Sequence, residues 1–214
     1  MIKIITLERE YGSGGAVIAQ KLAERLGWKL WDQLLTNEIA RSMKCNEAEV
    51  QEREERRDPL AYRLLKNFMR GTFEGNLNAP EMGILDADCI YAATKQIMPK
   101  LAQGDPCVVV GRGGAYFLGN RPDAYHVFIY APPEDKIRRL MEGGKSQEEA
   151  TDLVNSVDAE RAAFIKKYFN LQWPTLSRYH LMINSHIGVD AVIQTILDGI
   201  AVLEEKSRVG VGSP

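Results

Sequence analysis

Short apolar runs spaced along the chain predict the strands of a single sheet. They are built mainly from aliphatic and aromatic residues, which pack well on a pleated surface. The run at 106–110 is continuously apolar, as expected of a central parallel strand covered on both faces. The expected strands span residues 2–7, 28–31, 106–110, 125–131 and 181–184.

Stretches with apolar residues at helical spacing lie between these runs. The first begins at about residue 15 and ends at Gly27, a residue type that commonly closes helices. In the stretch 86–103, Pro99 is expected to kink the helix or start a new turn. Further helices are expected from residue 134, at 147–169 and at 190–205. This alternation predicts an α/β fold, an open parallel sheet of about five strands with helices on both faces.

The region between residues 33 and 103 predicts a helical insertion. Its charged part, 47–57, mixes both signs, which favours a solvated helix over a nucleic-acid-binding patch. A loop rich in Gly, Asn and Pro is expected at 71–83. We therefore expect a single domain over residues 1–206, followed by a frayed tail at 207–214.

Composition narrows the classes of protein further. The 214 residues fit one domain, and 45% hydrophobic with 26% charged residues is ordinary for a soluble globule. The 27 Lys and Arg against 29 Asp and Glu give a charge of −2, which argues against a nucleic-acid or membrane partner. No membrane span or signal peptide is predicted, which favours the cytoplasm. Three cysteines without a C-x-x-C pair predict neither disulfides nor a zinc site.

A glycine-rich turn at residues 11–15 joins the first strand to the first helix. Such a turn can hold phosphate groups, because backbone N–H groups and the helix N-terminus both favour an anion. The phosphate-binding signature G-x-x-x-x-G-K-[ST] is nevertheless incomplete. Arg9 stands at its first glycine, Gly15 at its lysine and Ala16 at its Ser or Thr. A simple strand-to-helix turn is the alternative.

Five segments together resemble the cytidylate-kinase-like family of P-loop proteins, which characteristically carries R-x-Y-G-S-G-G. They cover roughly residues 2–43 and 104–200, and they read LEREYGSGGAVIAQKLAERLGWKLWD, PCVVVGRGGAYFL, FIYAPPEDKIRRLME, DAERAAFIKKYFNLQW and YHLMINS. The resemblance implies a three-layer α/β/α P-loop kinase-like fold with ATP and Mg²⁺ as cofactors. It also implies a helical lid at about 138–172. Ala16 departs from the larger, often basic residue expected in this family.

The resemblance also assigns roles to residues. The ATP phosphates would lie over Tyr11, Gly12, Ser13, Gly14, Gly15 and Ala16. The residues expected at the transferred phosphoryl group are Asp32, Arg112, Arg161 and Lys167, together with Arg9, which precedes the loop and would supply the charge of the missing lysine. Asp32 would hold magnesium, through water, or orient an acceptor hydroxyl. Arg112, in Gly-Arg-Gly-Gly, would contact the acceptor phosphate, and its planar fork suits a phosphate.

Each assignment has a structural alternative. Arg9 could pair with Glu8 or Glu10, and Asp32 could cap the helix that follows it. Arg112 could form a structural ion pair, and the lid cations could lie on a solvated face. The rings of Tyr11 and Trp173 could stack on bases or belong to the core. No two histidines have metal-ligand spacing.

The leading functional hypothesis is a phosphotransferase that moves the γ-phosphoryl group of ATP to a CMP-like nucleoside monophosphate or a related small acceptor. A second hypothesis is an inactive nucleotide-binding or regulatory relative, because the lysine and the Ser or Thr are missing. In a third, the acceptor is a small alcohol or a phosphorylated metabolite. The apolar stripes of the insertion fit either a substrate lobe or an interface between copies of the chain, so a homo-oligomer stays open.

Overall fold

A computed structural model describes residues 1–32, 35, 38 and 87–208 of the chain. Its sheet has five parallel strands in the order β2-β3-β1-β4-β5, which confirms the predicted open parallel sheet. In the register, Ile5 of the central strand lies opposite Val108 on one side and Tyr125 on the other. The strands are β1 (Ile4–Arg9), β2 (Lys29–Trp31), β3 (Cys107–Val110), β4 (Ala124–Tyr130) and β5 (Leu181–Asn184).

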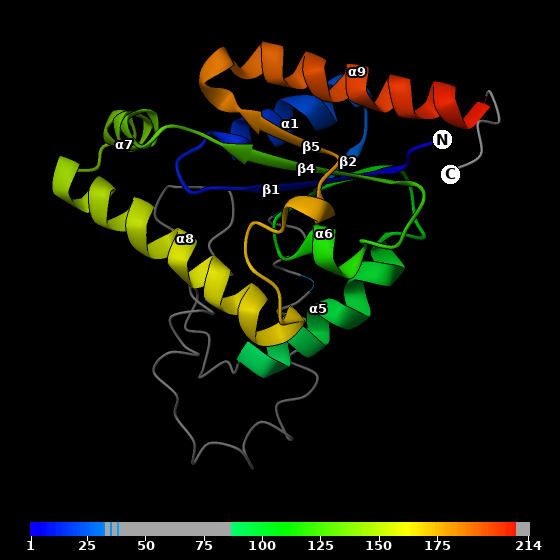
Figure 1. Cartoon of the computed structure of the whole chain (residues 1–214), viewed down its shortest axis with the longest axis horizontal. Helices are drawn as coiled ribbons and strands as arrows, with labels where there is room; N and C mark the ends of the chain where they lie inside the picture. Colours follow the sequence, from blue (N-terminus) through cyan, green and yellow to red (C-terminus); the bar gives the residue numbers. More distant parts are fainter. Residues whose placement is uncertain (33–34, 36–37, 39–86, 209–214) are drawn as a thin grey trace.

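Helices cover both faces of the sheet and complete the three-layer arrangement (Figure 1). One face carries α1 (Gly15–Leu26) and α9 (Val189–Arg208). The other carries α5 (Ala87–Leu101), α6 (Gly114–Phe117) and α8 (Gln147–Phe169). Near the carboxyl ends of the strands lie α7 (Pro133–Glu142) and the short 3₁₀ turn η3 (Ser185–Ile187), whereas the 3₁₀ turn η2 (Leu176–Arg178) precedes β5 and lies beside the segment that follows α6.

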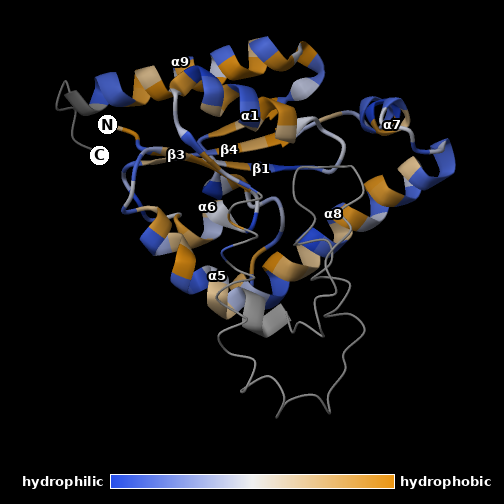
Figure 2. Cartoon of the chain, turned by 180° about the vertical axis from the view of Figure 1, so that it is seen from behind, coloured by the Kyte–Doolittle hydropathy of each residue, from blue (hydrophilic) through white to orange (hydrophobic). Residues whose placement is uncertain are grey.

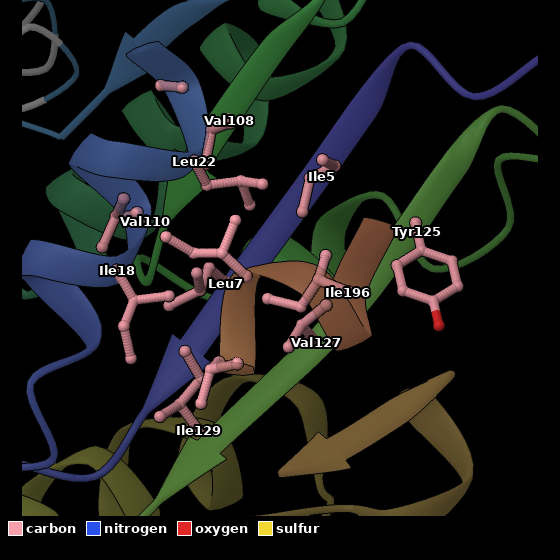
Figure 3. Close-up of a cluster of buried hydrophobic side chains, with 14 of the residues drawn as sticks. Ile5, Leu7, Ile18, Leu22, Val108, Val110, Tyr125, Val127, Ile129 and Ile196 are labelled. Atoms are coloured by element: carbon pink, nitrogen blue, oxygen red, sulfur yellow. The ribbon is translucent and has the colours of Figure 1, made fainter. Parts of the chain in front are cut away.

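The larger apolar core lies between β1, β3 and β4 and the helices α1 and α9 (Figure 3). Side chains alternate along a strand, so Ile5 and Leu7 of β1 face this core together. Ile18 and Leu22 of α1 meet them there, and all four side chains are fully buried. Figure 2 shows hydrophobic residues along the strands, while the outer helices carry both hydrophobic and hydrophilic residues.

The expected strands and longer helices agree with the described ones. Pro99 lies inside α5, and the short elements α6, η2 and η3 occupy segments where no helix was expected. The predicted insertion lies outside the described residues from 39 to 86, as does the tail beyond 208. None of the helices in the described ranges is long and apolar enough to span a membrane.

Candidate active site

The carboxyl ends of β1, β2 and β3 lie at one edge of the sheet because the three strands are parallel neighbours. The segments that follow them are the glycine loop, Asp32 and Gly111–Gly114. Open α/β sheets bind ligands at this edge. The structure therefore brings these three segments together at one edge of the sheet.

The glycine loop, residues 10–14, connects β1 to α1 in a conformation that needs glycine. Gly12 and Gly14 both have φ of 75°, and Gly14 is the N-cap of α1. A Cβ atom on Gly12 would lie 3.0 Å from Lys136 Cβ. The loop is thus pressed between the end of β1 and α7, with the open amides of the first turn of α1 beside it.

Arg9 explains why the lysine position of the loop holds a glycine. A Cβ atom on Gly15 would lie 2.8 Å from Arg9 Cβ, closer than side chains approach one another. A Cβ atom on Gly111 would overlap the guanidinium group of Arg9. Two glycines from different segments therefore make room for one arginine. The cation of this site comes from the end of β1 instead of from the start of α1.

Arg112 is buried beside this arginine, on a turn with strained backbone. Its φ is 57°, a conformation that costs a non-glycine residue about 1 kcal/mol. Burial and, next, repulsion by Arg9 lower the pKa of Arg112 to about 9, whereas Asp32 favours its charged form. A strained and buried cation at the sheet edge is typical of a functional site.

Arg161 reaches the same place from α8. It donates one hydrogen bond to the main-chain oxygen of Arg9 (2.8 Å) and another to Asp158 Oδ1 (3.0 Å). Burial and repulsion by Arg9 lower the pKa of Arg161 to about 10. Arg9, Arg112 and Arg161, here called the arginine cluster, come from three separate segments and repel one another.

Glu8 is a buried carboxylate whose charge interacts with all three residues of the arginine cluster, and it was not singled out from the sequence. Its side chain is buried, and it accepts a hydrogen bond from the N–H of Gly114. Burial raises the pKa of Glu8 even though all three arginines act to lower it. Within the described residues Glu8 Oε1 has no hydrogen-bond partner. The available signal was a carboxylate directly after the predicted strand 2–7, at the end where ligands bind.

Asp158 ties α8 to the glycine loop. Its Oδ1 accepts the N–H of Tyr11 at 2.9 Å, and its Oδ2 lies 3.7 Å from Lys136 Nζ. Lys136 also pairs with Glu10 Oε2 at 3.0 Å. The Tyr11 ring packs in an apolar cluster with Leu140 and residues of α8, which favours the core alternative for this side chain.

Asp32 is buried at the end of β2, where its charge acts on Arg112. Its capping alternative depends on residues 33 and 34, which lie outside the described ranges. Over the described ranges no three His, Cys, Asp or Glu residues group closely enough to hold a metal by themselves. Magnesium commonly binds through one or two carboxylates together with substrate phosphates, so a single buried Asp fits it.

Two further cations of the predicted lid, Lys167 and Arg139, lie in different surroundings. Lys167 is exposed on α8, about 9 Å along the helix axis from Arg161, with its ammonium 4.9 Å from the centre of the Tyr168 ring. It does not share the burial of the arginine cluster. Arg139 of α7, which the sequence did not single out, instead reaches the glycine loop, where it donates to the main-chain oxygen of Gly12 (3.4 Å).

Comparison with known proteins agrees with this architecture. The model of the cytidylate kinase-like family matches residues 4–187. An uncharacterized protein from Eubacterium ventriosum superposes with a TM-score of 0.68 at 24% identity, over 94% of this chain and 99% of that chain. No curated protein sequence matches significantly.

Two solved kinases share the fold at lower identity. A gluconokinase from Sinorhizobium meliloti has a TM-score of 0.55 at 14% identity, with 97% of both chains covered. A shikimate kinase from Acinetobacter baumannii in complex with shikimate has a TM-score of 0.50 at 17% identity, with 94% of both chains covered. The architecture is therefore that of a P-loop kinase.

Proposed function

This chain belongs to the cytidylate kinase-like family, and we propose that it transfers the γ-phosphoryl group of ATP to a CMP-like nucleoside monophosphate. The observation that carries the proposal is the position of Arg9, enclosed between Gly15 and Gly111. The positive charge that the loop lacks at residue 15 is present at residue 9. The missing lysine is then a relocation of charge and not a loss of it.

The arginine cluster is suited to a group that carries two negative charges. Phosphoryl transfer needs positioning and positive charge more than covalent chemistry. Arg9 and Arg161 would lie at the phosphoryl group in transit, and Arg112 at the phosphate of the acceptor. Because the three guanidinium groups repel one another, an anion between them relieves repulsion that the ligand-free protein carries.

Other parts of the site would assist in defined ways. The loop amides from Gly12 to Ala16 would bind the donor phosphates. Asp32 would hold Mg²⁺ through water, and bound Mg²⁺ would neutralise charge on the phosphates. We assign the lid to about residues 138–172, since α8 carries Arg161 and contacts the loop through Asp158. Lys167 stays a weaker candidate for phosphate binding from the same helix.

A second function, nucleotide binding without turnover, is favoured by one feature. Ala16 stands where a Ser or Thr would bind magnesium, so the described loop has no hydroxyl at that position. A regulatory protein that binds ATP would tolerate this loss, whereas a rapid kinase must place magnesium by other groups such as Asp32.

The deciding experiment measures ADP release with ATP and Mg²⁺ over a panel of acceptors. CMP, the other nucleoside monophosphates, shikimate and gluconate would be compared. We expect turnover with CMP, and Arg112→Ala should raise the KM for CMP or lower kcat. The control is Arg25→Ala, which removes an exposed arginine of α1. Turnover restricted to shikimate or gluconate would show that the acceptor is wrong. ATP binding without any turnover would support the regulatory alternative.

A further inference from the structure

The outer side of the glycine loop is held by two residues that neither the family match nor the arginine cluster accounts for. Arg139 of α7 donates from Nη1 to Ser185 Oγ at 3.1 Å, and from Nη2 to the main-chain oxygen of Ser185 at 3.3 Å. The same Nη1 also reaches the oxygen of Gly12 at 3.4 Å. Ser185, which is buried, donates from Oγ to the oxygen of Ser13 at 2.7 Å. Two successive loop carbonyls are thus bound from outside.

These hydrogen bonds to the loop carbonyls determine where the loop N–H groups point. In a trans peptide the C=O and the following N–H point in opposite directions. The oxygen of Ser13 is turned toward Ser185, so the N–H of Gly14 must point to the opposite face of the loop. The first-turn amides of α1, from Gly15 onward, have no intrahelical acceptor and open at the same helix end.

The two outer residues are themselves held in fixed positions. His186 Nδ1 lies 2.5 Å from Asp135 Oδ2, which joins the turn after β5 to α7. The N–H of His186 is bound by Asn184 Oδ1 at 2.9 Å. The guanidinium carbon of Arg139 lies 3.9 Å from where a Cβ on Gly14 would be, so the group rests against the loop backbone. The turn, α7 and the loop therefore form one connected unit.

We propose that Arg139 and Ser185 are positioning residues that hold the glycine loop in its anion-binding conformation before the donor nucleotide arrives. The proposal rests on the proposed function, since the ligand of the loop is taken to be the ATP phosphates. Arg139 acts through the loop backbone and leaves the contact with phosphate to the arginine cluster. A loop that lacks the lysine side chain is then ordered from outside by α7 and the turn after β5.

The test compares Ser185→Ala and Arg139→Met with Arg138→Met. The control removes a neighbouring charge of α7 whose partners are Asp135 and Glu142 and not the loop. We expect each test variant to weaken ATP binding about tenfold, the size of one or two lost hydrogen bonds, and to leave CMP binding unchanged. The double variant should lose less ATP affinity than the product of the two single fold-losses, because both residues act on the same loop.

Two further measurements separate a positioning role from direct contact with ATP. The amides of Ser13 and Ile18, which donate to the main-chain oxygens of Glu10 and Gly14, should exchange hydrogen faster in both ligand-free variants than in the control. The dependence of ATP affinity on salt should stay that of the wild type, because no ligand contact is removed. If Ser185→Ala changes neither exchange nor ATP affinity while Arg139→Met weakens ATP binding and flattens its salt dependence, Arg139 binds ATP itself and the proposal is overturned.

The exchange measurement needs no ligand, so it stands apart from the proposed function. If the wild-type protein binds no ATP, the proposed function fails, but faster loop exchange in both variants would still support the positioning role. Unchanged exchange in both variants would overturn the positioning role whatever the protein binds.

Discussion

The two halves of β1 are both buried and carry opposite chemistry. The first half, Ile4 to Leu7, is apolar except for Thr6, whose hydroxyl is hydrogen-bonded to His126 Nδ1 at 2.7 Å. The second half is Glu8 and Arg9, two charged residues that are also buried, with 5% and 8% of their surface exposed. Burial alone therefore does not tell why a residue is inside: one half forms the core, and the other lies at the site edge.

The difference is visible in how burial acts on each half. Burying Ile5 and Leu7 releases water from apolar surface, which stabilises the fold. Burial raises the pKa of Glu8, and together with repulsion by Arg9 it lowers that of Arg112, so the charged forms at this end are held at a cost. A protein that keeps such charges does so for binding, which gives each half its own expected response to mutation.

The largest effect is expected from Arg9→Gly. Loss of the loop cation should lower kcat/KM on the order of 10³-fold, comparable to removal of a preorganised charge-stabilising group. The double variant Arg9→Gly with Gly15→Lys moves the cation to the lysine position of the loop signature, and it should recover at least about tenfold of this loss. Steady-state kinetics with ATP, Mg²⁺ and CMP would measure both.

The single variant Gly15→Lys is the control for this exchange. It should be less stable than the wild type, because its Cβ would lie 2.8 Å from Arg9 Cβ. If Gly15→Lys is as active as the wild type, or if the double variant recovers nothing, Arg9 does not take the place of the lysine.

Next in size is the effect of Leu7→Ala in the core half of the strand. Leu7 is fully buried against α1, so the cavity should lower the free energy of unfolding by about 3 kcal/mol. Chemical denaturation measures this loss. The folded fraction should keep a kcat within about twofold of the wild type, in contrast to Arg9→Gly. An equal loss of kcat would mean that the two halves are not separable.

Much of the fold was predictable because its signals are local. The strand at 107–110 and the helix at 147–169 follow from consecutive residues, and the structure has both. The four-residue helix α6 was missed because one turn is too short to show a period. Its first residue, Gly114, belongs to the sequence Gly-Arg-Gly-Gly, which favours a turn over a helix.

The site was less predictable because its contacts join distant segments. Arg9 was named because the loop lacks a lysine, and Arg112 and Arg161 with the help of the family resemblance; the structure places the three together. The contacts of Arg139 with Ser185 and of Lys136 with Glu10 depend on the packing of α7, which no sequence spacing reports. The reason for glycine at residue 15, the first residue of α1, became clear only from the contact that a Cβ atom there would make with the Arg9 side chain.

A pH effect of intermediate size should come from the single polar pair in the core half. Burial, and next the nearby His180, lower the pKa of His126 to about 4, against 6.5 when the chain is unfolded. Between these values the unfolded chain binds more protons, so stability should fall as the pH drops from 6.5 toward 4. The loss should be on the order of 2 kcal/mol at pH 4.

Comparison with His126→Asn isolates this contribution from that of the carboxylates. Unfolding would be followed at several pH values for both proteins. The wild type should lose more stability than the variant over this range, and the two should run parallel above pH 7. Parallel curves over the whole range would show that His126 is not the group responsible.

The smallest change in stability is expected when both charges of the site half are removed. Glu8→Gln with Arg9→Met replaces two buried charges of opposite sign by neutral groups of similar size, and removal of buried charges together is often neutral or stabilising. We expect the free energy of unfolding at pH 7 to stay within about 1 kcal/mol of the wild type or to rise, while turnover is lost. Burial raises the pKa of Glu8 above its ordinary value of 4.5, so between 4.5 and the raised pKa the folded protein binds more protons than the unfolded chain. The wild type should therefore lose stability as the pH rises above 4.5, and the variant should lack this part of the pH dependence. A large loss of stability in the double variant would mean that Glu8 and Arg9 hold the fold together, and that the two halves of β1 serve the same purpose.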